Sequence, residues 1–296
     1  MRFKDAQKPL CALLASLCLA NGAFAELREV NDAELGEITG QAVVAFDITD
    51  TADARFTRLT LGLETEFQIN TDEVVLGEYA DPLTAASADL DLRHLSFGHI
   101  ARADGHVGLD GKTYNANDIV PFLGNDPYME IAAQGNDILG IRFGFNQALG
   151  SVSGDFQSFS GAVGMQILDS TGIPQAATLF DASGVATDYR ATHIGLSDAA
   201  TDCATGIQCT ALSQIGTFDV GKRGSSGGAS STGDFFIAVQ RDGVDWQSAD
   251  NAGGVISAAP GVFLSLPTAM QLDIGQLEAG VQRQRTEYID RGLGLF

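Results

Sequence analysis

The sequence predicts an all-β protein: a single antiparallel sandwich or barrel-like domain, preceded by a signal peptide and a short helical segment. Apolar and polar residues alternate strictly over residues 59–69, which is typical of a strand with one buried and one solvent-facing side. Similar alternation recurs at residues 88–92, 129–133, 139–145, 235–239, 262–266 and 270–274. Because no stretch after residue 40 has a long helical period, we expect residues 41–296 to form one β-rich domain.

Turn signals and phase changes mark where these strands are interrupted. Asp-Gly and Asn-Asp pairs stand between the alternating segments, and the run Gly-Asn-Asp-Pro at residues 124–127 predicts a turn. The apolar positions shift by one residue near His94, and they shift again within residues 152–167. An extra residue in a strand produces such a shift, so each place predicts a β-bulge or a turn.

Residues 1–25 have the layout of a signal peptide. Three basic residues precede a largely apolar run at residues 10–20, and a small-x-small triplet ends at Ala25. The apolar run falls well short of the roughly 20 residues that span a bilayer. We therefore expect cleavage after Ala25 and export to the periplasm, the outer membrane surface or the extracellular space.

A short helical segment is expected directly after the signal peptide, at residues 26–40. Asn31 and Glu34 match a capping box, and Leu35 and Ile38 fall on one helical face. A glycine follows where a C-cap residue commonly ends a helix. The mature chain is thus expected to begin with this segment and to continue into strands.

Acidic residues dominate the mature chain. Beyond Ala25 there are 14 Lys and Arg against 37 Asp and Glu, a formal net charge of −23. Such a charge repels nucleic-acid phosphates and anionic lipid head groups, so neither is expected as a partner. It favours a surface on which soluble molecules repel one another.

Cys203 and Cys209 are the two cysteines outside the signal peptide. Five residues separate them in a polar segment, and an isolated pair in an exported chain predicts a disulfide that closes a small loop. The Cys-x-x-Cys spacing of redox enzymes is absent, and too few further ligands lie nearby in the sequence for a zinc site.

No motif assigns catalysis to this chain. Residues 224–228 match the Gly-x-Ser-x-Gly pattern of hydrolases, with Ser226 at the nucleophile position. A nucleophile elbow joins a strand to a helix, whereas this match lies in a Gly/Ser tract that a strand follows, so we reject it. We therefore expect no enzyme activity, no catalytic residue and no cofactor.

Histidines and a group of aspartates are the candidate metal ligands of the sequence. The four histidines are His94, His99, His106 and His193. Their spacing matches no known zinc pattern, so no metal site is expected among them. The calcium candidates are Asp104, Asp110 and Asp118, which are hard oxygen ligands on a Gly-rich loop. The same residue types are typical of turns, so turn formation is the alternative explanation.

The C-terminal residue indicates an outer-membrane β-barrel as an alternative architecture. The chain ends in Phe296, as the closing strands of outer-membrane barrels do, although alternate residues before it form a poor lipid-facing row. One Trp and five Tyr are also few for two aromatic girdles. An outer-membrane β-barrel remains an alternative, and a membrane is expected as a partner in that case alone.

The start of the mature chain carries a resemblance. Residues 32–41, Asp-Ala-Glu-Leu-Gly-Glu-Ile-Thr-Gly-Gln, resemble the mature N-terminus of uncharacterised secreted β-rich proteobacterial proteins, some of them associated with pili or surface filaments. Residues 126–130 and 142–145 are similar to segments of the same group. The resemblance implies a secreted β-rich protein of the cell surface, and it carries over no catalytic residue.

We therefore expect an exported, non-enzymatic protein with a structural or accessory role in a surface filament or pilus. Its expected partners are other cell-surface or pilus components, or further copies of itself. The alternatives are the outer-membrane barrel and a secreted carbohydrate-binding protein or hydrolase.

Overall fold

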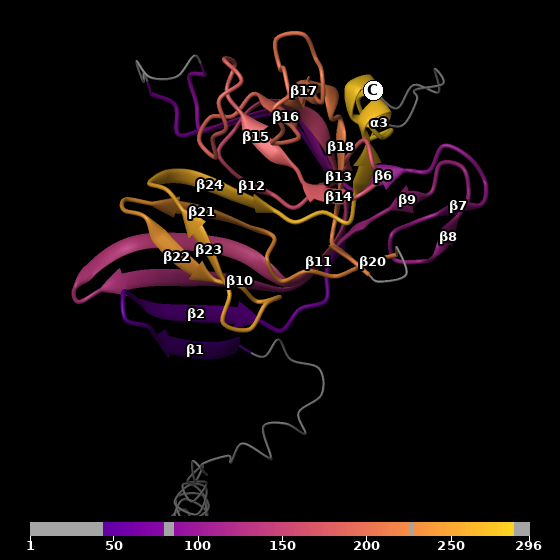
Figure 1. The fold of residues 1–296 in the computed structure, drawn as a ribbon. Coiled ribbons are helices and arrows are strands. Elements are labelled where there is room, and N and C mark those ends of the chain that lie inside the picture. The colour runs from indigo at the N-terminus through magenta and orange to yellow at the C-terminus, as the bar shows by residue number, and fades with distance from the viewer. Residues whose placement is uncertain (1–43, 80–85, 225–227, 287–296) are drawn as a thin grey trace, which may run out of the picture. The chain divides into compact units, whose positions relative to one another are not determined.

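The computed structural model describes residues 44–79, 86–224 and 228–286, which form an almost wholly β structure (Figure 1). Ala42–Phe296 make up one compact unit. The signal peptide with its cleavage site at Ala25 and the helical segment at residues 26–40 lie outside the described residues. Among the described residues, no helix is long and apolar enough to cross a membrane.

The longest strand, β11 (Asp137–Phe159), is shared by two sets of neighbours. Its first part pairs with β10 (Phe122–Gln134) on one side and β21 (Phe236–Gln240) on the other. Its last part pairs with β5 (Leu90–Phe97) and β18 (Thr217–Val220). We call the sheet around the first part sheet A and the sheet around the last part sheet B.

Sheet A has the strand order β1–β2–β10–β11–β21–β24–β12. The strands not yet bounded are β1 (Val44–Asp50), β2 (Arg55–Leu61), β24 (Gly261–Leu266) and β12 (Gly161–Val163), and β3 (Glu66–Phe67) pairs with one end of β10. Figure 1 shows this sheet from β1 at its lower edge to β24 and β12 above. The outer strands β1 and β12 do not pair with each other in the described residues, so sheet A is open.

Sheet B has the order β4–β5–β11–β18, with β4 spanning Ile69–Leu76. The main hydrophobic core includes side chains of both sheets, among them Leu92, Phe122, Val152, Phe156 and Phe218. Each of these is almost fully buried. The core lies around the part of β11 at which one sheet passes into the other.

A smaller second core covers one side of sheet A. The hairpin of β22 (Val244–Gln247) and β23 (Val255–Ala258) packs on that side, and its Trp246 is completely buried. Trp246 contacts Phe56 of β2 and Phe236 of β21, with ring centroids 5.8 and 6.4 Å apart. This side of sheet A is thus closed to solvent where the hairpin lies.

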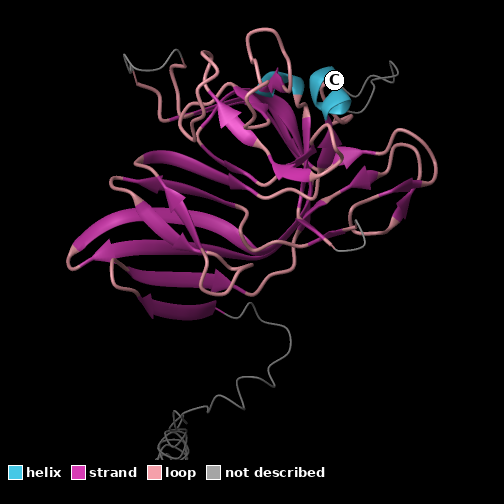
Figure 2. Ribbon diagram, viewed as in Figure 1, coloured by secondary structure: helices cyan, strands magenta, loops and turns pink. Residues whose placement is uncertain are grey.

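The other elements are short, and among the described residues the helical ones are confined to η1 (Leu212–Gln214) and α3 (Ile274–Ala279) (Figure 2). The remaining strands are β6 (His99–Ile100), β7 (His106–Val107), β8 (Thr113–Tyr114), β9 (Ile119–Val120), β13 (Gln166–Leu168), β14 (Pro174–Ala176), β15 (Thr178–Phe180), β16 (His193–Gly195), β17 (Cys209–Ala211), β19 (Lys222–Arg223), β20 (Ala229–Ser230) and β25 (Gln271–Asp273). Sequence periodicity missed α3 because six residues are too few to show a helical period.

The predicted all-β class is confirmed, with two corrections to its architecture. The pairs β12–β24 and β13–β25 are parallel, so the sheets are mixed rather than purely antiparallel. Because sheet A is open, the barrel-like arrangement expected as one of two possibilities is wrong.

The strand predicted at residues 59–69 is divided into three. β2 ends at Leu61, and the chain then passes β10 toward sheet B through two backbone hydrogen bonds, Gly124 N to Thr65 O and Asp126 N to Leu63 O (2.9 and 2.8 Å). These bonds also explain why the turn predicted at residues 124–127 is wrong: this run lies inside β10. Both predicted phase shifts are confirmed as irregularities of pairing, one around His94, whose φ is +50°, and one between Phe156 and Ser158.

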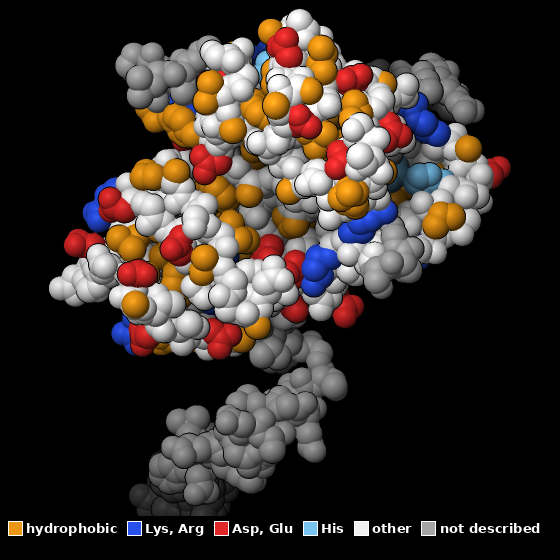
Figure 3. Space-filling model, viewed as in Figure 1, with side chains coloured by type: hydrophobic (Ala, Val, Ile, Leu, Met, Phe, Trp, Pro, Cys, Tyr) orange, Lys and Arg blue, Asp and Glu red, His pale blue; other side chains and the backbone are white. Residues whose placement is uncertain are grey.

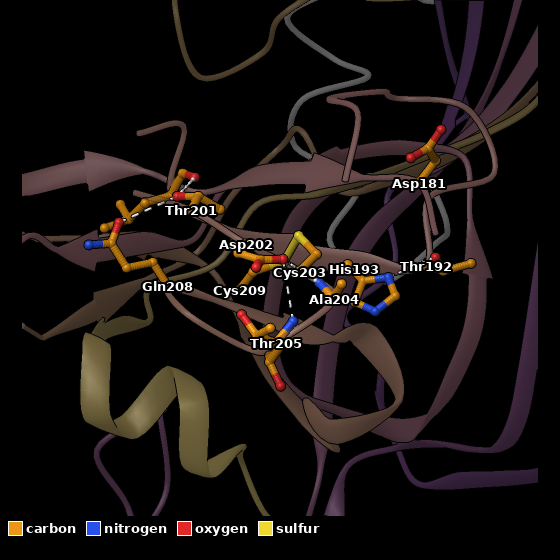
Figure 4. Close-up of a disulfide and its surroundings, with 12 residues drawn as sticks. Asp181, Thr192, His193, Thr201, Asp202, Cys203, Ala204, Thr205, Gln208 and Cys209 are labelled. Carbon is orange, nitrogen blue, oxygen red and sulfur yellow. Dashed lines mark hydrogen bonds between the residues drawn. A yellow bond between two sulfur atoms is a disulfide. The ribbon is translucent and has the colours of Figure 1, made fainter. Parts of the chain in front are cut away.

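The predicted disulfide is present. Cys203 and Cys209 are bonded, with their Cα atoms 4.9 Å apart, and Figure 4 shows the small loop that they close. Asp202, just before the loop, exchanges two backbone hydrogen bonds of 3.0 Å with Ile207 inside it, and the Asp202 carboxylate accepts from Ala204 N. The loop therefore has a local hydrogen-bonded structure in addition to the covalent link.

We predict that replacing both cysteines (Cys203→Ser with Cys209→Ser) lowers the free energy of unfolding by about 2 kcal/mol, because the bridge restricts only a short loop of the unfolded chain. Urea denaturation of the oxidised protein and the double variant measures the difference. Wild-type protein in reductant should have the same urea midpoint as the double variant. If both kept the midpoint of the oxidised wild-type protein, the prediction would be contradicted.

Candidate functional site

One side of sheet A is apolar and open to solvent. Pairing places Phe46 opposite Leu59, Leu59 opposite Met129, Met129 opposite Phe143, and Phe143 opposite Ile237. Alternate residues of a strand point to the same side, so this row continues into rows above and below it. We call the whole surface the apolar face; its residues are Val44, Phe46, Ile48, Leu59, Leu61, Met129, Ile131, Ile141, Phe143, Ile237 and Val239.

Large side chains of the apolar face are exposed to a degree unusual for core-type residues. Phe46 is 70% exposed, Ile48 58%, Val239 55% and Phe143 50%. The alternation in the sequence predicts that this side is buried, and the structure corrects that expectation, because Leu61 is also exposed. Scattered exposed hydrophobics need no explanation, but a contiguous patch marks an interaction surface.

Toward sheet B the apolar face deepens into a cleft of about 460 Å³. Phe145 and Ile237 of sheet A line one wall, and Ile69, Leu92 and Phe97 of sheet B line the other. No charged side chain lines the cleft in the described part of the chain. The cleft is therefore the covered end of the same apolar surface.

The opposite side of sheet A holds a buried ionic network. Glu130 of β10 accepts a hydrogen bond from Arg142 Nε at 2.5 Å and another from Arg58 Nε at 2.9 Å. The Arg142 side chain is 1% exposed, and its guanidinium lies 5.0 Å from the Trp246 ring centre. Arg58 lies over the Tyr128 ring at 4.2 Å.

This network fixes which residues face which side. Glu130 pairs directly with Arg142, and Tyr128 pairs with Gly144, so residues 126–130 and 142–145 of the sequence lie side by side. A Cβ at Gly144 would lie 2.7 Å from the Phe235 carbonyl oxygen and 2.8 Å from the Tyr128 hydroxyl oxygen, so only glycine fits there. A slip of one residue would expose Glu130 or Arg142 on the apolar face, which the buried ion pairs oppose.

A second buried ion pair joins the segment between β15 and β16 to the segment between β4 and β5, and a hydrogen bond ties the latter to sheet A. Arg190 Nε donates to Asp89 Oδ1 at 3.0 Å, and the other Asp89 oxygen accepts from Val262 N of β24, also at 3.0 Å. Arg190 further donates to the carbonyl oxygens of Gly77 and Ala86. Both charged side chains are at most 1% exposed, so the pair is shielded from water and its charges are satisfied within the protein.

The calcium candidates lie in and beside the β7–β8 hairpin, and their carboxylates make local hydrogen bonds. Asp104 accepts from Ala116 N, Asp110 from Lys112 N and Asp118 from Asn115 N, at 2.8, 3.1 and 2.7 Å. In residues 44–79, 86–224 and 228–286, no group of three or more His, Cys, Asp or Glu side chains is placed to hold a metal ion. The bonds of Asp110 and Asp118 close local turns, whereas the bond of Asp104 joins residues 12 positions apart. Ser226, the rejected nucleophile, lies outside the described residues.

Two of the four histidines form a pair that sequence spacing did not suggest. His99 Nε2 lies 2.9 Å from His106 Nε2, and His99 Nδ1 lies 2.7 Å from the Ser151 hydroxyl. Burial, together with the charges of His106 and Arg102, lowers the pKa of His99 from 6.5 to about 4. His94 is exposed at the bulge, and His193 hydrogen-bonds Thr192.

Comparison with known proteins adds no relative: no protein-family model, curated protein or solved structure matches this chain.

We predict that Glu130→Gln lowers the free energy of unfolding by about 3–5 kcal/mol, because it leaves two arginines with no buried countercharge. Thermal and urea unfolding measure the loss. Glu73→Gln is the matched control, since Glu73 forms an exposed pair with Arg93 at 3.8 Å, and it should change stability very little. Equal effects of the two variants would contradict the structural role of Glu130.

We predict that stability falls as the pH decreases from 6.5 toward 4. In that range the unfolded chain binds a proton at residue 99 that the folded chain does not, because folding lowers the pKa of His99 to about 4. His99→Gln should flatten the pH dependence of the urea midpoint in this range. His94→Asn, a change at an exposed histidine, should leave the dependence in place; a wild-type slope in His99→Gln would refute the assignment.

Proposed function

We propose that this protein is an exported, non-enzymatic structural or accessory component of the cell surface, and that the apolar face is its working surface. The proposal is carried by the row that runs across sheet A from Phe46 to Phe143, whose two phenylalanines are 70% and 50% exposed. On the other side of the sheet, buried ion pairs of Glu130 hold the strands in register. A rigid apolar surface of this kind matches the core of a protein–protein interface.

The composition of the apolar face indicates the kind of contact it makes. A carbohydrate is held by polar side chains that hydrogen-bond its hydroxyl groups, and hydrolysis needs a pair of acidic groups or a nucleophile with its base. The described side chains that line the cleft include no charged group, and the exposed side chains of the apolar face are hydrophobic. The geometry therefore favours a protein partner of a surface structure, such as a pilus or filament component, over the alternative of a carbohydrate-binding protein or hydrolase.

We predict that Phe46→Ser with Phe143→Ser removes the protein from the cell-surface fraction without unfolding it, because both side chains are exposed in the free chain. Fractionation of cells that express the tagged full chain into periplasm, outer membrane and medium measures the change. Val107→Ser with Ile173→Ser is the matched control, since these exposed residues lie on other elements. Wild-type chain that never occurs in the surface fraction would contradict the proposed function.

A further inference from the structure

We propose that the partner on the apolar face is a second copy of this chain, so that two sheets A pack face to face about a two-fold axis. The inference rests on the proposed function for the assignment of this face as the working surface. It adds the identity of the occupant and the geometry of the contact. Packed sheets lie about 10 Å apart with their strands inclined by about 30°.

The exposed area of the apolar face approaches that of a stable protein–protein interface. An aromatic side chain buries about 150–250 Å², so Phe46 and Phe143, at 70% and 50% exposure, together leave roughly 200–300 Å² uncovered. With Val44, Ile48, Leu61, Val239 and the half-buried members of the rows, the open area is on the order of 600–800 Å². A stable interface buries about 800 Å² per partner, whereas the largest patch on a typical monomer is about 300–600 Å².

The apolar face is also chemically complementary to a second copy of itself. A two-fold contact sets the same surface against itself, so it needs a surface that satisfies its own chemistry. The apolar face meets this condition, because its rows consist of aliphatic and aromatic side chains, with Thr57 between Ile48 and Ile131 as their polar member, whose hydroxyl can both donate and accept a hydrogen bond. Its charged neighbours stand at one end of the rows, where Arg55 pairs with Asp50 and Arg241 with Asp242.

The size of the face argues against smaller occupants. A single added strand would pair with the edge of β1 that no described strand occupies, and it would leave the rows across β2, β10 and β11 uncovered. An aliphatic ligand of the size of the cleft would fill the end near sheet B and leave Phe46, Ile48 and Val239 in water. A second sheet A covers the full width at once.

The formal charge of −23 beyond Ala25 gives the contact a characteristic salt dependence. Two acidic copies repel each other, and salt screens that repulsion while it leaves apolar burial intact. Association should therefore tighten as the salt concentration rises, which is opposite to the behaviour of a contact held by ion pairs.

The test uses exported, processed protein purified from cells that express the full chain. Sedimentation equilibrium over roughly 1–100 µM protein and about 0.05–0.5 M salt should show a monomer–dimer equilibrium that tightens with salt. Phe46→Ser with Phe143→Ser should raise the dimer dissociation constant at least ~30-fold, the effect of losing one interface hot spot. Val107→Ser with Ile173→Ser should leave the constant unchanged. Circular dichroism and the urea midpoint establish that each variant is folded.

Several outcomes would overturn the dimer. Wild-type protein that is folded and monomeric throughout, or that purifies as a monomer carrying a lipid detected by mass spectrometry, rules it out. So does equal weakening by the control pair. The two proposals fail separately: a monomer whose Phe46→Ser, Phe143→Ser variant is lost from the surface fraction keeps the proposed function and removes the dimer. A dimer that never reaches the cell surface keeps the two-fold contact and removes the proposed function.

Discussion

Strand β11 is the constraint on which the rest of the structure depends. Because its first part belongs to sheet A and its last part to sheet B, the two sheets diverge from a single strand. Sheet B can therefore cover sheet A only near the point of divergence, where the main core and the cleft lie. Beyond that point, in the part of the chain that the structure describes, the strands of sheet A continue without a covering layer on the same side. The open apolar face is thus a consequence of topology, and a change in surface residues alone could not close it.

The two sides of sheet A depend on each other. On one side, Trp246 and the ion pairs of Glu130 with Arg58 and Arg142 hold β2, β10 and β11 in register. Strand side chains alternate, so this register also decides that Met129 and Phe143 stand next to each other on the other side. Buried ion pairs contribute little net stability, because desolvation offsets their attraction, but they disfavour every register that would separate them. Their value here lies in specifying the apolar face.

Local features of this fold follow from the sequence, and the long-range ones do not. The disulfide between Cys203 and Cys209 and the bulge at His94 are predictable because spacing and phase within a few residues determine them. The alternation in residues 59–69 assigns Leu59 and Leu61 to the correct side, yet periodicity reports only that a side is apolar, not that another layer covers it. The pair of Asp89 with Arg190 joins residues 101 positions apart, and no local pattern selects it among so many acidic residues.

The charge of the chain and its apolar face have opposite effects on association. Asp and Glu side chains are spread over the side of the molecule seen in Figure 3, with no single acidic patch. At physiological salt their repulsion acts over about 8 Å, so it opposes approach in most orientations. Apolar burial acts only at contact and grows with the area matched. An orientation that joins two large apolar surfaces can therefore overcome the repulsion, whereas a contact through one isolated residue such as Val107 or Ile173 cannot.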